Sequence, residues 1–238
     1  MKLNKICILI IAISISFCAC KEMDSGNEAK EDTLINSDEK NEVNKEKEHL
    51  FNFMIGHGKI IHTKDISYEI EIIMKDGYYF DEDSMGPFYG DNYIGQFEIV
   101  LKKDGNIVNN FDLSKDWAER YDDELRFRKK FEIELIDYGS DGNYEFLIGQ
   151  YFSSNLNLYK MYQINTSQDE IIAINDLGYL NVSGSRETEK LNQDKDGNYY
   201  VSGYDNSKSK YFKIPIIFHE GKITKGEIEY HDEIIDIP

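Results

Sequence analysis

One loop of the sequence places three carboxylates at a spacing that could hold a metal ion. Asp137, Asp141 and Glu145 occupy its first, fifth and ninth positions, and Gly142 lies at the sixth. Calcium takes about 6–8 oxygen ligands, and a loop bent at a glycine can direct several carboxylates at one point. The spacing therefore predicts a weak calcium site, completed by a backbone carbonyl near Asn143 and by water. The alternative is a hairpin turn whose aspartates accept hydrogen bonds from their own backbone.

This segment resembles the calcium loops of FG-GAP and VCBS-type repeats, in which the pattern D-x-D-x-D-G-x-x-D/E leads into an apolar strand. Phe146, Ile148 and Gly149 continue that pattern, whereas Gly139 stands where the repeats carry a second carboxylate. The resemblance implies a calcium ion held by the loop and a strand directly after it. The region is also similar to uncharacterised surface lipoproteins of bacteria, in which such a loop precedes a strand ending in Gly-Gln-Tyr.

A second candidate site is the aromatic segment between residues 78 and 93. It mixes tyrosine and phenylalanine rings with four acidic residues and is long for a connection between strands. Functional loops often have this character. Tyrosine rings beside carboxylates can stack on a sugar or hold a peptide, so we predict a peptide or carbohydrate site at Tyr78, Tyr79, Tyr89 and Tyr93. The alternative is that half of the rings pack inward and the acids keep the loop solvated.

The sequence carries none of the familiar catalytic motifs. It contains no HExxH spacing, no GxSxG nucleophile elbow and no phosphate-binding loop. The sequence does not exclude a pair of carboxylates that hydrolyses glycosides, because the distance between two carboxylates in space is not visible in a sequence. We therefore expect a non-catalytic binding or structural domain. The alternative is a secreted, carboxylate-dependent hydrolase that acts on cell-wall or polysaccharide material.

The first twenty residues are typical of an export signal. Lys2 and Lys5 precede an apolar run over residues 6–17, which Ala19 and Cys20 close. A positive start, a short apolar stretch and a small-residue cleavage site describe a secretory signal. The run is shorter than the roughly 20 apolar residues that cross a bilayer. Its end resembles the lipobox of bacterial lipoproteins, which implies cleavage before Cys20, lipidation of that thiol and attachment to the outer side of the cell membrane.

The charge balance narrows the choice of partners. The chain has 27 Lys and Arg residues against 45 Asp and Glu residues, a formal net charge of −18. Removal of residues 1–19 takes away Lys2 and Lys5 but no acid, which leaves a net charge of −20. Nucleic-acid phosphates require a basic face, so this balance argues against nucleic acid as a partner. It also argues against electrostatic docking of the domain on anionic lipid.

Composition divides the chain into three parts. Residues 1–19 form the predicted signal peptide. Residues 20–49 hold Cys20 and a stretch dominated by Lys, Glu, Asp, Asn and Ser, which cannot bury enough apolar surface to offset its ordering entropy. We therefore predict a disordered tether that reaches roughly 30 Å on average. Residues 50–238 are long enough for one domain with a sizeable core.

Alternating apolar and polar residues predict an all-β fold for residues 50–238. Residues 66–74, 125–135 and 156–164 show the two-residue period of strands, and only residues 114–123 look helical. Asp-Gly pairs suit the positive φ values of hairpin turns, and they occur at residues 76–77, 104–105, 141–142 and 196–197. We predict a single antiparallel β domain of two packed, sandwich-like sheets. A partial propeller-like arrangement is the alternative, because the Asp-Gly-Asn-Tyr sequence at residue 141 recurs at residue 196.

Overall fold

The structure is a computed structural model that describes residues 47–122, 124–154, 156–184 and 187–233. All of the described residues belong to one compact unit, Asn44–Pro238. The predicted signal peptide, Cys20 and most of the predicted tether lie outside the described residues. The first strand begins at Glu48, slightly before the domain boundary that the composition predicts.

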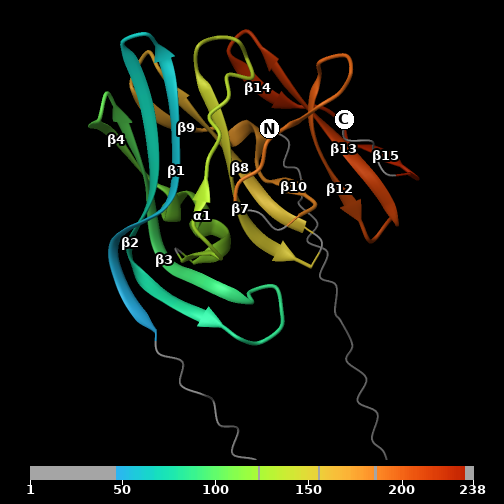
Figure 1. The fold of residues 1–238 in the computed structure, drawn as a ribbon. Coiled ribbons are helices and arrows are strands. Elements are labelled where there is room, and N and C mark those ends of the chain that lie inside the picture. The colour runs from blue at the N-terminus through green and yellow to red at the C-terminus, as the bar shows by residue number, and fades with distance from the viewer. Residues whose placement is uncertain (1–46, 123, 155, 185–186, 234–238) are drawn as a thin grey trace, which may run out of the picture. The chain divides into compact units, whose positions relative to one another are not determined.

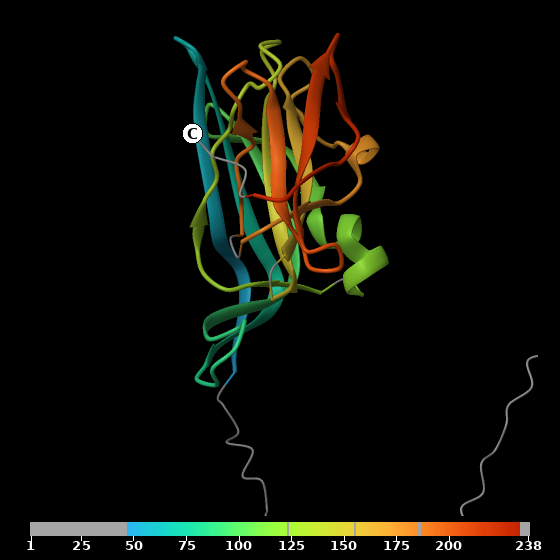
Figure 2. The same ribbon diagram turned by 90° about the vertical axis from the view of Figure 1, so that its right-hand side faces the viewer.

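Sheet A contains six strands: β1 (Glu48–Thr63), β2 (Ile66–Glu82), β3 (Gly90–Lys103), β4 (Asn106–Asp112), β5 (Leu125–Phe127) and β6 (Phe131–Glu132). They pair in the order β4-β3-β2-β1-β6, with β5 also on β3. The pairs are antiparallel except for β1 with β6, which is parallel. At the end where β1 begins, the hairpin of β2 and β3 extends beyond the other strands (Figures 1 and 2).

Two smaller sheets complete the domain. Sheet B consists of β7 (Tyr144–Ser153), β8 (Leu156–Asn165), β9 (Glu170–Ala173) and β10 (Leu180–Val182). Sheet C consists of β11 (Asn192–Gln193), β12 (Tyr199–Asp205), β13 (Lys210–His219), β14 (Lys222–Lys225) and β15 (Glu229–His231). Both sheets are antiparallel. The all-β prediction is confirmed, with three sheets where two were expected.

Sheet B is the middle layer, and both of its faces are buried. Phe146 and Ile148 of β7 belong to a core shared with Ile72 of sheet A. Leu147 of the same strand belongs to a second core, shared with Val201 of sheet C. Figure 1 shows the yellow strands of sheet B between the blue-green strands of sheet A and the orange-red strands of sheet C. A strand that is buried on both faces has a continuous apolar sequence, which explains why β7 lacks the alternation seen in β2.

Two-residue turns join β3 to β4 and β13 to β14, and the first of them is the turn predicted at Asp104 and Gly105. Asp104 and Gly105, between β3 and β4, have φ values of 50° and 79°. Glu220 and Gly221, between β13 and β14, have φ values of 49° and 72°. Two successive positive φ values are typical of the two-residue turns that match the twist of an antiparallel hairpin.

The prediction of a turn at Asp76 and Gly77 is wrong. β2 continues through both residues, and Gly77 lies opposite Gly95 of β3. A side chain on either glycine would run into the backbone of the neighbouring strand. The two glycines therefore serve a close approach of backbones next to a register shift, a role that an isolated glycine in a strand often has.

The one α-helix among the described residues, α1 (Leu113–Tyr121), confirms the helix expected over residues 114–123. It begins after Asp112, whose side chain accepts a hydrogen bond from Lys115 N at 3.1 Å, an ordinary N-cap. Trp117 is fully buried, and its Nε1 donates to the hydroxyl of Tyr162 in β8 at 2.9 Å. No helix in the described ranges is long and apolar enough to cross a membrane.

The segment 125–135, expected as one strand, is split into β5 and β6. β5 lies on β3 and β6 lies on the free edge of β1, so the chain crosses the sheet between them. Gly58 of β1 lets the chain directly after β6 lie close to β1, because a Cβ there would lie 2.6 Å from the carbonyl oxygen of Ile133. The crossing leaves the side chain of Glu132 84% exposed beside β1.

Candidate functional site

The predicted calcium loop is a turn held by its own aspartates. Asp137 accepts hydrogen bonds from Asp141 N at Oδ1 and from Gly142 N at Oδ2, both at 3.0 Å. Asp141 Oδ1 accepts a third from Asn143 N at 3.0 Å. Ser140 and Gly142 have φ values of 53° and 86°, the left-handed region that turns often require. These hydrogen bonds match the hairpin-turn interpretation of the spacing.

Glu145, the third predicted calcium ligand, points into the protein. It is 1% exposed, and its two carboxylate oxygens accept hydrogen bonds from Gln163 Nε2 at 2.8 Å and from Tyr138 N at 3.1 Å. Burial raises the pKa of this carboxyl to about 7, because removal from water disfavours the ionised form. Glu145 therefore holds the base of the turn from the inside.

A calcium ion shared by the predicted ligands requires a rearrangement of this turn. Within the described part of the chain, no three acidic, histidine or cysteine side chains are placed to hold a metal ion. Glu145 would have to turn outwards, and Asp137 would have to release two amide donors. The Asn143 side chain is also engaged, since its Oδ1 accepts a hydrogen bond from Thr166 N at 3.1 Å. Calcium binding at Asp137, Asp141, Asn143 and Glu145 stays a prediction.

The melting temperature distinguishes a metal site from a hydrogen-bonded turn. A turn in which the backbone donors stay on Asp137 would give the same melting temperature in millimolar calcium and in chelator. Calcium at about ten times its dissociation constant would instead add about 1.4 kcal/mol to the free energy of unfolding. That gain would raise the melting temperature by a few degrees. Such a rise in the wild type, lost in Asp141→Ala, would establish the calcium site.

The four predicted aromatic ligand residues divide between the interior and the surface. Tyr93 is 7% exposed. The Tyr79 hydroxyl donates to Asp91 Oδ1 at 2.9 Å, a hydrogen bond that raises the pKa of Tyr79 to about 12. Tyr78 and Tyr89 stay 47% and 62% exposed. A peptide or carbohydrate site at these residues stays a prediction, and Tyr78 and Tyr89 are the two exposed members of the four.

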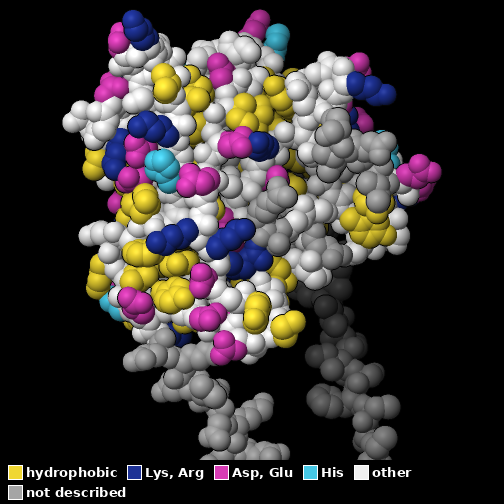
Figure 3. All heavy atoms as spheres, viewed as in Figure 1, with side chains coloured by type: hydrophobic (Ala, Val, Ile, Leu, Met, Phe, Trp, Pro, Cys, Tyr) yellow, Lys and Arg dark blue, Asp and Glu magenta, His cyan; other side chains and the backbone are white. Residues whose placement is uncertain are grey.

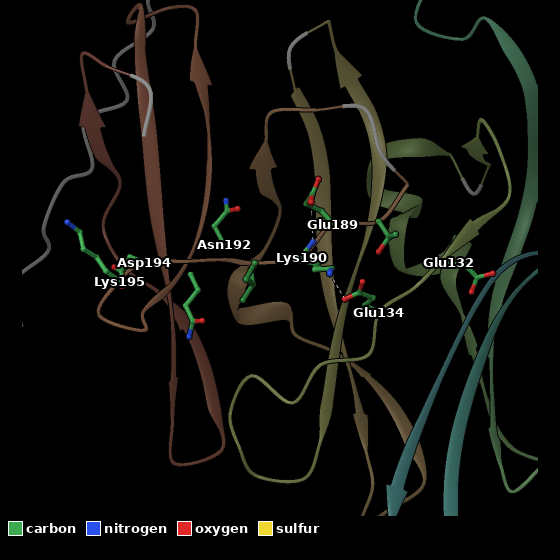
Figure 4. Close-up of a pocket in the computed structure, with 10 residues that line it drawn as sticks. Glu132, Glu134, Glu189, Lys190, Asn192, Asp194 and Lys195 are labelled. Atoms are coloured by element: carbon green, nitrogen blue, oxygen red, sulfur yellow. Dashed lines mark hydrogen bonds and ion pairs between the residues drawn. The ribbon is translucent and has the colours of Figure 1, made fainter. Parts of the chain in front are cut away.

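A furrow follows the segment that leads into β11. Its larger part is a hollow of about 680 Å³ between Glu132 and Glu134 on one side and residues 188–195 on the other. Figure 4 shows Lys190 reaching across to Glu134, with 2.5 Å between Nζ and Oε2. Its smaller part has a volume of about 490 Å³ and shares Asp194 with the larger part. The two hollows together are termed the furrow.

Aromatic rings line the smaller part of the furrow. Tyr138, Tyr199 and Phe218 form a cluster whose ring centroids lie 4.8, 5.6 and 5.7 Å apart. The Tyr138 hydroxyl accepts a hydrogen bond from Leu191 N at 3.0 Å, and burial raises the pKa of Tyr138 to about 12. Tyr199 and Phe218 are half-buried. Their rings can therefore offer an apolar surface to a ligand in the hollow.

Two acidic residues of the furrow, Glu134 and Asp194, are engaged in ion pairs with lysine side chains. Lys213 Nζ lies 3.1 Å from Asp194 Oδ2, in addition to the pair between Lys190 and Glu134. A backbone hydrogen bond from Asn198, together with Lys213, lowers the pKa of Asp194 to about 2. A carboxyl held in its ionised form in this way is a poor general acid near neutral pH.

The furrow is not visible in the sequence, because segments far apart in the chain form its walls. They come from residues 132–139, 188–199 and 213–218, together with Glu229. The one signal that points to it is the repeated Asp-Gly-Asn-Tyr sequence. Gly142 and Gly197 both have a φ of 86°, and a strand follows each copy. In the second copy the tyrosine that begins the strand is Tyr199, which lines the furrow.

Comparisons with known proteins do not identify a family or a function for this chain. The chain has no match among protein-family models, curated proteins or solved structures. The features of the chain that bear on its function are its N-terminal pattern, the furrow, the buried Glu145 and the exposed tyrosines.

Proposed function

We propose that this protein is an extracytoplasmic lipoprotein, anchored to the cell membrane through Cys20, whose β domain binds a ligand in the furrow without catalysing a reaction. The positive start, the apolar run and the Ala19-Cys20 pair support the anchor. The open furrow, with its aromatic cluster and ion-paired acids, supports ligand binding.

One observation carries the non-catalytic assignment: Glu145, the carboxyl group whose pKa is raised by burial, does not line the furrow. Glu145 has a pKa of about 7 but is 1% exposed, with hydrogen bonds to both oxygens. Asp194 lies in the furrow and has a lowered pKa. Hydrolysis by two carboxylates needs a group that keeps its proton beside the substrate. Glu134 and Asp194 of the furrow are each paired with a lysine, which favours their ionised forms. The furrow is therefore better suited to ligand binding than to hydrolysis by two carboxylates.

The lining of the furrow favours a polar oligomer as the ligand. Asn192, Gln193 and Asn198 bring amide groups, which both donate and accept hydrogen bonds. Tyr199 and Phe218 bring apolar ring surface beside these amides. A carbohydrate chain or a peptide presents the matching combination of polar groups and apolar faces. Such ligands occur in cell-wall and polysaccharide material outside the membrane.

Calorimetric titration with soluble cell-wall oligosaccharides and peptides tests this function. We expect saturable binding without turnover, and Tyr199→Ala and Phe218→Ala should each weaken it by about tenfold, or about 1.4 kcal/mol. Tyr204→Ala is the matched control, because Tyr204 is also in β12 but packs on Tyr211. Product formation that Asp194→Asn or Glu132→Gln abolishes would favour the hydrolase instead.

Replacement of Cys20 should separate the anchor from the domain. We expect the wild-type chain to be cut before Cys20 and to partition into detergent, because an acylated cysteine adds hydrocarbon chains. Cys20→Ala should stay uncut and unlipidated, as shown by intact mass. Cys18→Ala is the matched control and should be processed normally, since bulky Phe17 precedes Cys18 whereas small Ala19 precedes Cys20. Normal processing of Cys20→Ala would disprove the anchor.

A further inference from the structure

The end of sheet A where β1 begins carries an exposed group of apolar side chains. Phe51, Tyr78, Met85 and Tyr89 are 62%, 47%, 90% and 62% exposed. The ring of His49 joins two of them, with centroids 4.2 Å from Phe51 and 4.9 Å from Tyr78. Figure 3 shows hydrophobic side chains at this end, together with Lys and Arg side chains and with Asp and Glu side chains. Exposed apolar groups of this kind mark contacts with proteins or membranes. These four residues are termed the aromatic end.

Cations lie against aromatic rings next to the aromatic end. The guanidinium of Arg126 is 3.6 Å from the ring centroid of Phe88 and 5.5 Å from that of Phe80. Lys47 Nζ is 5.4 Å from the Phe80 ring, and Arg128 donates a hydrogen bond to the carbonyl oxygen before Phe88 at 3.3 Å. These contacts hold the connection between β2 and β3 in place. Aromatic rings accompanied by cations are enriched where proteins meet the membrane–water interface.

The chain enters the domain at this same end. Lys47 is the first described residue, and β1 begins by pairing Glu48 with Tyr79. Lys64, in the turn between β1 and β2, lies at the opposite end of the hairpin. The rise of about 3.3 Å per strand residue separates the two ends by roughly 50 Å. An anchor that precedes Lys47 in the chain therefore connects to the domain beside the aromatic end and far from Lys64.

We propose that the aromatic end docks the domain on the phospholipid surface, with Phe51, Tyr78, Met85 and Tyr89 entering the headgroup region. This inference rests on the proposed attachment through Cys20. The net charge of −20 that remains after removal of residues 1–19 opposes attraction to anionic lipid. Docking must then come from burial of rings and of the methionine side chain, which salt does not screen. The domain would lie with the Lys64 turn directed away from the membrane.

The cysteine content of the chain makes this orientation measurable. After cleavage the chain keeps only Cys20, whose thiol carries the lipid, so Met85→Cys adds a single free thiol for a polarity-sensitive fluorophore. Lys64→Cys places the same label at the opposite end, where the side chain is also exposed. The lipidated protein is reconstituted in vesicles of phosphatidylcholine and phosphatidylglycerol. We expect a blue shift of the label at position 85, no shift at position 64, and no loss of the shift in high salt.

A matched variant and two further measurements make the result decisive. Phe51→Ser combined with Tyr89→Ser should reverse the shift at position 85 without changing the circular dichroism spectrum, because both side chains are exposed. A label at position 85 that stays in water on lipidated, vesicle-bound protein would overturn the docking. A shift that needs no vesicles and grows with protein concentration would make a second copy of the chain the occupant, and would also overturn it.

Intact mass separates failure of the docking from failure of the proposed function. A chain without lipid on Cys20 would refute the anchor itself. The same labelled chain, mixed with vesicles at high lipid concentration, then tests the aromatic end alone. A blue shift at position 85 but not at position 64 would support the aromatic end as a membrane-docking surface. Equal emission at both positions would refute the docking proposal.

Discussion

Trp117→Ala should lower the free energy of unfolding by about 4 kcal/mol, within the range for a large aromatic residue lost from a core. Trp117 is fully buried between α1 and the sheets. Its Nε1 donates to the Tyr162 hydroxyl at 2.9 Å, and that hydroxyl donates to Asp116 Oδ2 at 2.8 Å. Lys160 Nζ lies 2.7 Å from the same carboxylate oxygen. The substitution therefore leaves a cavity and removes one donor from a buried network.

Urea unfolding followed by circular dichroism measures this loss, since Trp117 is the single tryptophan and its fluorescence disappears with it. Trp117→Phe separates the two contributions, because it keeps most of the volume and loses the donor, at a cost of about 1–2 kcal/mol. Lys115→Ala, on the exposed side of α1, should change little. A loss below about 1 kcal/mol in Trp117→Ala, an ordinary surface-like value, would show that α1 is not packed as described.

Stability should fall as the pH rises through neutrality, because of Glu145. Burial raises its pKa in the folded protein to about 7, above the value of 4.5 for the free side chain. The folded state therefore binds this proton more tightly than the unfolded state. The contribution is fully present below pH 4.5 and is lost as the pH passes 7. Between about pH 5 and pH 8 the expected decrease is about 2 kcal/mol, at about 1.4 kcal/mol per pKa unit.

Other carboxyl groups act in a different pH window. The pKa values of several aspartates are lowered by hydrogen bonds and ion pairs, so their contribution is lost only as the pH falls into the acid range; they are Asp112, Asp169, Asp194 and Asp205. Measurements from pH 5 to pH 8 therefore isolate Glu145 from these aspartates.

Glu145→Gln is the substitution that identifies the responsible group. It removes the charge and keeps the shape, and Gln163 can rotate its amide to offer an oxygen to the new NH₂ group. We expect this variant to lose most of the decrease between pH 5 and pH 8 and to exceed the wild type in stability at pH 8. Glu134→Gln, whose parent side chain is 58% exposed, should keep the wild-type profile. Parallel profiles for Glu145→Gln and the wild type would exclude Glu145 as the source.

Local sequence patterns predict much of the fold, but they fail at particular elements. The alternation of residues 66–74 and the Asp104-Gly105 turn are local signals, and the strand and hairpin they predict are present. The Asp76-Gly77 pair carries the same local signal, but there the glycine meets Gly95 across the sheet. A turn residue and a close-packing residue look alike in sequence, because both need the space that a missing Cβ leaves.

The sequence by itself determined the all-β class and the acidic net charge, because both depend on residue type and on spacing along the chain. It could not determine where Glu145 points, since burial of that carboxylate depends on Tyr138 and Gln163 closing over it. The tertiary structure alone decided that β7 is buried on both faces, that distant segments form the furrow, and that exposed rings gather where the chain enters the domain. These features depend on contacts between residues far apart in the chain, and the periodicity of a single segment does not contain them.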